Sequence, residues 1–288
     1  NNGGPTRTMK LLAGSPAINA VPLASMIPGI LTDQRGSGFP RQGGPFVDVG
    51  AVEFGVTPQD LNNDGNADLV FQNNAGQIYE WNMNGGGGIF SQGYLYGAGL
   101  GDWKVAGIAD MNNDGFADLV FQNTVGQLYV WFLDGTGGGI NFTTGSGLKP
   151  GSNYLYGAGL SDWKVVAVAD VNGDGFADLL FQNGVGQIYV WFLDGTGNGI
   201  NFATGSGLKT GISSKYLYDS GLGDWEVTGV ADLNGDGFAD LVFQNTVGQI
   251  YMWFLDGTGA GINFTTGSGL KPGSRFLYGS GLGDWRVR

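Results

Sequence analysis

The sequence predicts an all-β protein built from four repeated units. Glycine accounts for 57 of the 288 residues, and hydrophobic residues make up 42% of the chain. Glycine supplies the positive φ angles that tight turns need, so this composition favours many short strands over long helices. A nine-residue acidic cluster also recurs four times, followed by a similar apolar stretch each time. We therefore expect a β-propeller, with a β-sandwich or a stacked β-solenoid as the alternatives.

Each unit contains four segments with the pattern of a β-strand. In the second unit they are residues 103–110, 117–123, 126–134 and 154–160, which are rich in β-branched and aromatic residues. The Asp-Gly-Thr-Gly turn at 134–137 ends the third segment. Successive acidic clusters begin 50, 60 and 62 residues apart. Four short strands in a unit of this length are the content of one propeller blade, so we expect four such blades.

The repeated aromatic residues fall inside these strands. Phe121 and Trp131 stand in the second and third segments of their unit, and the other units repeat them. We expect them to fill the space between neighbouring blades. The alternative is a set of stacking platforms for sugars, which would need exposed rings.

The way in which the ring closes is open at the level of sequence. A stretch with the pattern Asp-Trp-x-Val precedes the last three clusters, at Trp103, Trp163 and Trp225, and a further copy begins at Trp285. The first unit lacks this stretch, and Pro58 weakens the strand expected there. We expect the segment from Trp285 to pair with the first blade. A larger ring, or a strand supplied by another copy of the chain to give a fibre, are the alternatives.

The acidic clusters have the spacing of a metal-binding loop. In the pattern D-x-N-x-D-G-x-x-D, side-chain oxygens stand at positions 1, 3, 5 and 9, and position 7 can offer its backbone carbonyl. Calcium takes six to eight oxygen ligands, whereas magnesium sheds water reluctantly, so we expect about four Ca²⁺ ions, one in each loop. An EF-hand is excluded because position 12 is phenylalanine and strands flank the loop. The expected ligands are Asp60, Asn62, Asp64, Asn66, Asp68, Asp110, Asn112, Asp114, Phe116, Asp118, Asp170, Asn172, Asp174, Phe176, Asp178, Asp232, Asn234, Asp236, Phe238 and Asp240.

Metal binding would relieve the electrostatic repulsion between the carboxylates of each acidic cluster. Three carboxylates around one divalent cation leave about one negative charge in each loop. We therefore expect the loops to be poorly ordered without metal, and the last aspartate to be a bidentate ligand.

The cluster and the Ala-Asp-Leu-Val-Phe-Gln-Asn stretch that ends the second copy resemble the FG-GAP/VCBS-type repeat of integrin-like β-propellers. The resemblance covers about residues 56–288 and implies a calcium loop between the first two strands of each blade. Residues 1–55 are similar to the end of bacterial right-handed parallel β-helix surface proteins. This second resemblance implies that they are the last coil or cap of such a helix, in a longer secreted protein.

Composition excludes several functional classes. The net charge of −12 argues against nucleic-acid binding, which needs clustered Lys and Arg. The absence of cysteine and histidine removes thiol nucleophiles, the Ser-His-Asp triad and most zinc sites. Residues 11–31 are apolar enough to suggest a membrane span, but Pro16, Pro22 and Pro28 argue against one.

The function that fits best is a non-catalytic, calcium-binding repeat protein, secreted by a bacterium or held on its surface. It would act in adhesion or matrix interaction and bind an extracellular glycan or protein. The alternative is a structural subunit that self-associates into an extracellular filament by strand addition. A polysaccharide-active enzyme is a third reading, but a catalytic site normally occurs once, whereas every distinctive feature here is repeated.

Overall fold

The computed structural model describes residues 59–62, 64, 66–84, 86–234 and 238–287, with short stretches between residues 8 and 51. Those stretches are 8–9, 17, 20–22, 25, 33–34, 46–47 and 49–51. Most of the predicted domain 1–55 lies outside the described residues. Its described part includes one antiparallel pair, β1 (Val21–Pro22) with β2 (Phe46–Val47). The assignment of this segment as a β-helix cap stays a prediction.

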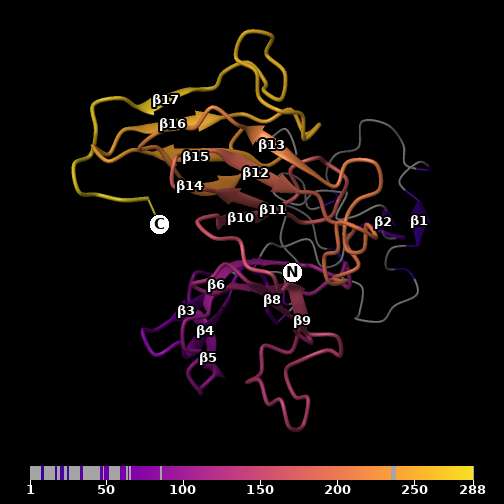
Figure 1. The fold of residues 1–288 in the computed structure, drawn as a ribbon. Coiled ribbons are helices and arrows are strands. Elements are labelled where there is room, and N and C mark those ends of the chain that lie inside the picture. Colours follow the sequence, from indigo (N-terminus) through magenta and orange to yellow (C-terminus); the bar gives the residue numbers. More distant parts are fainter. Residues whose placement is uncertain are drawn as a thin grey trace.

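The rest of the described chain forms four antiparallel sheets, one for each repeat, so the predicted all-β propeller is confirmed (Figure 1). Each sheet is a blade whose strands follow one another in chain order. The first blade holds β3 (Leu69–Gln72), β4 (Ile78–Met83) and β5 (Ile89–Tyr96). The second holds β6 (Lys104–Ala109), β7 (Asp118–Gln122), β8 (Leu128–Trp131) and β9 (Asn153–Tyr156). The third holds β10 (Lys164–Ala169), β11 (Asp178–Gln182), β12 (Ile188–Trp191) and β13 (Ser214–Tyr218). The fourth holds β14 (Glu226–Ala231), β15 (Asp240–Gln244), β16 (Ile250–Trp253) and β17 (Arg275–Tyr278).

The first strands of neighbouring blades lie against one another at the inner side of the arrangement. β10 contacts both β6 and β14. Gly107 lets β6 approach this closely, because a Cβ atom there would stand 2.2 Å from Cγ2 of Val168 on β10. The antiparallel pairing within each blade excludes the stacked solenoid, whose strands would pair with the next repeat.

The hydrophobic core lies between the blades. Phe121 and Trp131 are 2% and 4% exposed, and their ring centroids are 4.5 Å apart. They pack with Ile78 and Leu95 of the preceding blade. The third and fourth blades repeat this arrangement with their own phenylalanine and tryptophan. These aromatic residues are therefore core residues, as expected, and not exposed platforms for sugars.

A glutamine at the end of each second strand fastens one blade to the next. Nε2 of Gln122 donates to the carbonyl of Trp163 at 2.9 Å, and its Oε1 accepts from the amide of Val165 at 3.0 Å. Gln72, Gln182 and Gln244 make the same pair of bonds to the tryptophan and valine of the following unit. The Asp-Trp-x-Val stretch is thus the point at which each blade is attached to its predecessor.

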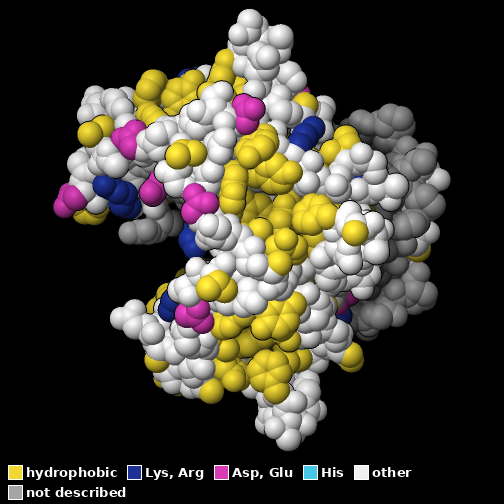
Figure 2. All heavy atoms as spheres, in the orientation of Figure 1, with side chains coloured by type: hydrophobic (Ala, Val, Ile, Leu, Met, Phe, Trp, Pro, Cys, Tyr) yellow, Lys and Arg dark blue, Asp and Glu magenta, His cyan; other side chains and the backbone are white. Residues whose placement is uncertain are grey.

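The expected closure through Trp285 is wrong for this structure. Gln244 holds Trp285 and Val287 against the fourth blade, and neither residue belongs to a strand. Within the described residues β3 pairs only with β4, so the first sheet has three strands. The C-terminus lies beside the fourth blade (Figure 1), and an indentation separates the fourth blade from the first (Figure 2). The four sheets of the described residues form an open arc. No helix in the described part of the chain is long and apolar enough to cross a membrane.

Candidate metal loops

The last aspartate of each acidic cluster links its loop to the third strand of the blade. Oδ2 of Asp118 accepts a hydrogen bond from the amide of Met111 at 2.9 Å, and Oδ1 accepts one from Leu133 at 3.0 Å. Asp118 is fully buried. The equivalent aspartates make the same two bonds, from Leu61 and Met83 to Asp68, from Val171 and Leu193 to Asp178, and from Leu233 and Leu255 to Asp240. This residue has a structural role in every blade.

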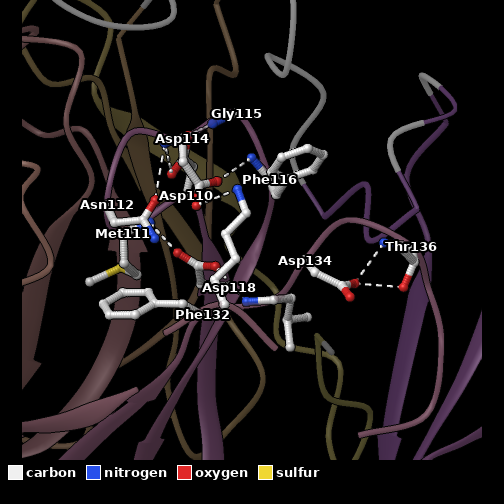
Figure 3. A network of polar contacts seen from close by, with 12 residues as sticks. Asp110, Met111, Asn112, Asp114, Gly115, Phe116, Asp118, Phe132, Asp134 and Thr136 are labelled. Atoms are coloured by element: carbon white, nitrogen blue, oxygen red, sulfur yellow. Dashed lines mark hydrogen bonds and ion pairs between the residues drawn. The ribbon is translucent and has the colours of Figure 1, made fainter. Parts of the chain in front are cut away.

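The first aspartate closes the loop on itself. Oδ1 of Asp110 accepts from the amide of Asp114 at 3.1 Å, and its Oδ2 accepts from Gly115 at 2.7 Å (Figure 3). The φ angle of Gly115 is 88°, which explains the glycine at position 6 of the motif. Asp170 receives the corresponding bond from Gly175 in the third blade. The first and fifth positions of the motif are therefore brought together by backbone hydrogen bonds.

The third and fifth positions lie at the turn of the loop. Oδ1 of Asn112 accepts from the amide of Asp114 at 3.0 Å, and Oδ1 of Asp114 accepts from Phe116 at 3.1 Å. In the first loop, Asn62 and Asp64 make the same kind of bond. In the third loop, Oδ1 of Asn172 is buried and has no hydrogen-bond partner among the described residues. One amide oxygen is thus left without a donor inside an acidic loop.

A lysine that the sequence reasoning missed reaches these loops. Nζ of Lys149 lies 2.7 Å from Oδ2 of Asp114 and 3.9 Å from the centre of the Phe116 ring. Lys209 pairs with Asp174 in the same way. The lysine follows the fifth-position aspartate by 35 residues in both blades, and this constant spacing is the signal that could have predicted the contact. Lys271 continues the series, 4.6 Å from the centre of the Phe238 ring.

The phenylalanine at position 7 of the second, third and fourth loops packs against a glycine turn of its own blade. The Phe116 ring packs so closely on the turn at Gly135 that a Cβ atom there would lie 1.8 Å from it. Phe176 and Phe238 lie against Gly195 and Gly257 in the same manner. The glycine of the Asp-Gly-Thr-Gly turn therefore makes room for the phenylalanine of the acidic loop.

Burial and mutual repulsion disturb the titration of the loop carboxylates. Burial raises the pKa of Asp118 to about 9, and the neighbouring charges of Asp110 and Asp114 contribute to the rise. Burial, aided by the charge of Asp114, raises the pKa of Asp110 to about 6. In the third loop burial raises the pKa of Asp178 to about 8. The negative charge in these loops is thus only partly compensated by the protein itself.

The comparisons with known proteins address the repeat directly. A family model described as FG-GAP-like repeat matches residues 60–121, 110–181 and 170–243, which together cover more than half of the chain. The chain belongs to the FG-GAP-like repeat family. Each match begins at the first aspartate of one acidic cluster and ends at the phenylalanine that follows the next. The FG-GAP-like unit is therefore the one that carries the loop, and no curated protein matches the chain.

Two solved structures are distantly similar to this FG-GAP-like chain. Prp20p from Saccharomyces cerevisiae is 14% identical over 66% of this chain and 42% of its own, with a TM-score of 0.28. Human WBSCR16 is 13% identical over 67% of this chain and 47% of its own, with a TM-score of 0.29. The chain thus spans less than half the length of either protein.

The oxygen ligands of the FG-GAP-like loops suit a hard cation, although these oxygens accept hydrogen bonds from other groups of the protein. Every side-chain donor in the motif is an oxygen, and the structure places the first, third, fifth and ninth positions in one loop. Among the described residues, however, no three acidic side chains are grouped closely enough to hold a metal ion. Their oxygens face backbone amides and, in two loops, a lysine ammonium. Asp236 of the fourth loop lies outside the described residues, whereas Asp232, Asn234 and Asp240 lie within them.

A buried acid without a counterpart in the other repeats lies in the first blade. Glu80 is 3% exposed and occupies the position of Val130, Val190 and Met252. Its Oε2 has no hydrogen-bond partner among the described residues, and burial raises the pKa of its carboxyl to about 7. Sequence reasoning missed it, although the break in the repeated pattern marks it.

Proposed function

We propose that this chain is a non-catalytic, calcium-stabilised repeat protein that acts in adhesion or matrix interaction outside a bacterial cell. The observation that carries the proposal is the recurrence of one loop in every blade, each with three carboxylates and an amide at the same positions. In the second, third and fourth blades the loop joins the first strand to the second, and its last aspartate accepts a hydrogen bond from the leucine that lies just after the third strand. A cation bound there would stabilise the whole blade.

Calcium is the cation that this donor set favours. Its ligands would be the oxygens of positions 1, 3, 5 and 9 and the carbonyl of position 7, and Ca²⁺ accepts six to eight such oxygens in flexible geometry. Each carboxylate oxygen has a second lone pair beyond the one used by a backbone amide. The Oδ1 of Asn172 supports this assignment in the third loop, because it is a buried oxygen that no donor among the described residues uses.

The placement of the acids supports a non-catalytic role. Asp118 and its equivalents are fully or almost fully buried and bonded to the backbone. Glu80 has no repeated counterpart but is only 3% exposed, away from any substrate in solvent. Turnover of an acidic polysaccharide by the purified chain would overturn this part of the proposal.

The same chemistry supports an extracellular location. Calcium sites of modest affinity are filled at the millimolar concentrations found outside cells. The partner would be an extracellular glycan or protein, bound by a set of blades that calcium holds in shape. Binding to a panel of immobilised glycans and matrix proteins, with and without chelator, tests this step. Loss of binding on chelation is expected, and no binding to any of them would overturn the adhesion role.

Isothermal titration of the metal-free chain with calcium tests the metal proposal. Wild-type protein should bind about one ion for each loop, and Asp170→Asn should bind one ion fewer. Asp194→Asn is the matched control, because Asp194 lies in the Asp-Gly-Thr-Gly turn of the same blade and its side chain accepts hydrogen bonds from Thr196 of that turn. Equal stoichiometry in wild type and Asp170→Asn, or no binding at millimolar calcium, would contradict the proposal.

A further inference from the structure

Strand β4 of the first blade buries two polar residues where the other blades carry apolar ones. Glu80 occupies the position that Val130 has in the second blade. Asn82 occupies the position of Phe132, directly after the tryptophan of the third segment. Glu80 and Asn82 are each 3% exposed. The repeated pattern is therefore broken twice within one strand, and both changes bury polar atoms.

These two side chains face the junction of the first and second blades. Residues of a strand alternate between its two faces, so Ile78, Glu80 and Asn82 share one face, and all three are buried. Ile78 packs in one cluster with Phe121 of the second blade. A Cβ atom on Gly137, in a turn of the second blade, would stand 3.0 Å from Nδ2 and 3.3 Å from Oδ1 of Asn82. Glu80 lies between these two contacts along the strand.

The next two junctions have an aromatic ring at the corresponding place. The Phe132 ring lies so close to Gly197 of the third blade that a Cβ atom there would stand 2.4 Å from it. Phe192 lies against Gly259 of the fourth blade in the same way. Hydrocarbon thus fills these two junctions at the place where the first junction has a carboxylate and an amide.

Two buried oxygens of the first junction lack a donor. Oε2 of Glu80 and Oδ1 of Asn82 have no hydrogen-bond partner among the described residues, whereas Nδ2 of Asn82 donates to Oγ of Ser91 at 2.9 Å. Burial raises the pKa of the Glu80 carboxyl to about 7, the Asn82 amide lowers it, and the charge of Asp68 raises it. Buried oxygens without a donor and buried carboxylates without a cation both destabilise a fold. A cation held between these oxygens removes both costs.

We propose that Glu80 and Asn82 form a calcium site at the junction of the first two blades, separate from the acidic loops. Its ligands are the carboxylate of Glu80, Oδ1 of Asn82 and a free lone pair on Oγ of Ser91. With the charge of Asp68 nearby, the site carries two negative charges, which a divalent cation balances. Calcium accepts six to eight oxygens in flexible geometry, so water completes its shell, whereas magnesium demands a near-ideal octahedron. Ser91 is exposed, which gives the ion a path from solvent.

Such an ion would make the first junction depend on calcium. The other junctions hold their blades together at this place by apolar contact, whereas this one would use ligands from β4 and β5 beside the turn at Gly137. Neither Glu80 nor Asn82 belongs to the D-x-N-x-D-G-x-x-D pattern. The inference therefore does not require the acidic loops to bind an ion.

The double variant Glu80→Val, Asn82→Phe tests the proposal, because it restores the pair that the second and third blades carry. Isothermal titration of the metal-free variant with calcium should show one bound ion fewer than wild type, whether or not the loops also bind. Glu226→Val, at an exposed position at the start of β14, is the control and should keep the wild-type number. Equal numbers of ions in wild type and the double variant would overturn the proposal.

Glu80→Gln keeps the size of the side chain and covers the case in which the double variant packs poorly. It should weaken this one binding step at least tenfold, and an unchanged affinity would count against the site. Thermal melts add a second readout. Calcium should raise the melting temperature of wild type more than that of the double variant, and an equal rise in the two would contradict the inference.

Diffraction from wild-type crystals grown in millimolar calcium locates the ion directly. The expected result is an anomalous difference peak about 2.3 to 2.6 Å from oxygens of both Glu80 and Asn82. A direct hydrogen bond between the Asn82 amide and the Glu80 carboxyl, with no peak between them, would overturn the proposal. Peaks in the acidic loops alone would support the loops and reject the junction site.

Discussion

The ammonium of Lys149 lies 2.7 Å from Oδ2 of Asp114, so the protein supplies its own positive charge to an acidic loop. Lys209 and Asp174 repeat the contact one blade later. The lysine and a metal ion would compete for the same carboxylate. If the loops bind calcium as proposed, they would exist in two forms, one holding the lysine ammonium and one holding the ion, and each form would reduce the negative charge of the loop.

Removal of this lysine should strengthen calcium binding. In Lys149→Met the carboxylate of Asp114 loses its ion pair, which is worth up to about 1 kcal/mol at such partly exposed positions. Calcium affinity of the second loop should rise by up to about fivefold, as measured by isothermal titration. Lys104→Met, at an exposed position at the start of β6, is the control and should leave the affinity unchanged. A weaker affinity in Lys149→Met would mean that the lysine assists the ion.

The last aspartate of each loop should stabilise the folded state even in the absence of metal. Asp118→Asn replaces one carboxylate oxygen by an amide group that cannot accept the bond from Met111 or Leu133. A buried amide left without its acceptor destabilises a protein by about 2 kcal/mol. Urea unfolding of the metal-free variant should show this loss, while Asp134→Asn, in an exposed turn, should lose far less. Equal losses in the two variants would mean that the bonds of Asp118 do not stabilise the blade.

The hydrogen bonds that Gln122 makes to the next blade should contribute a comparable amount to the free energy of unfolding. Gln122→Ala removes both bonds to the next blade and leaves the carbonyl of Trp163 and the amide of Val165 without their partner. We expect a loss of about 2 kcal/mol in the free energy of unfolding. Thr143→Ala, at an exposed loop position, is the control and should change it by less than about 0.5 kcal/mol. Unfolding of the Gln122 variant in two steps would indicate that the blades have become uncoupled.

The metal-free protein should lose stability as the pH rises. The pKa of Asp118 is about 9 and that of Asp178 about 8 in the folded chain, well above the ordinary value for aspartate. The folded state thus holds these protons more tightly than the unfolded state does. Their stabilising contribution is complete below about pH 4 and is lost as the pH rises through 8 to 9.

Thermal melts in metal-free buffer at about pH 5, 7 and 9 measure this trend, and the melting temperature should fall along the series. Calcium competes with the same protons, so millimolar calcium should restore most of the stability at the alkaline end. The double variant Asp118→Asn, Asp178→Asn should show a flatter profile. A melting temperature that rises with pH in the absence of metal would contradict the assignment of protonated carboxylates.

The sequence predicted the repeated parts of this molecule and missed contacts between distant positions. The acidic clusters and the strands that follow them are local patterns, so four blades with a loop in each could be inferred. The contact of Lys149 with Asp114 and the bonds of Gln122 to the next blade join residues far apart in sequence. No local pattern predicts such pairs, although the 35-residue spacing of the lysine and its aspartate, which recurs in the third blade, is visible afterwards.

The prediction for Trp285 failed for a related reason. Its similarity to Trp103 correctly indicated the start of a further unit. Gln244 donates a hydrogen bond to the carbonyl of Trp285, as Gln72 does to the carbonyl of Trp103. Whether such a segment also reaches the first blade depends on the geometry of the whole arc. That geometry is a property of all the junctions together and cannot be inferred from one unit.

Calorimetric melting of the whole chain, with saturating calcium and after removal of the ion by chelator, tests the central claim most directly. At a calcium concentration of about one hundred times the dissociation constant, each site adds about 2.7 kcal/mol to the stability of the folded state. For a chain of this size, even one such site raises the melting temperature by about 4 to 5 °C. The account predicts a fall of at least this amount on chelation, reversed by added calcium. An unchanged melting temperature would contradict it.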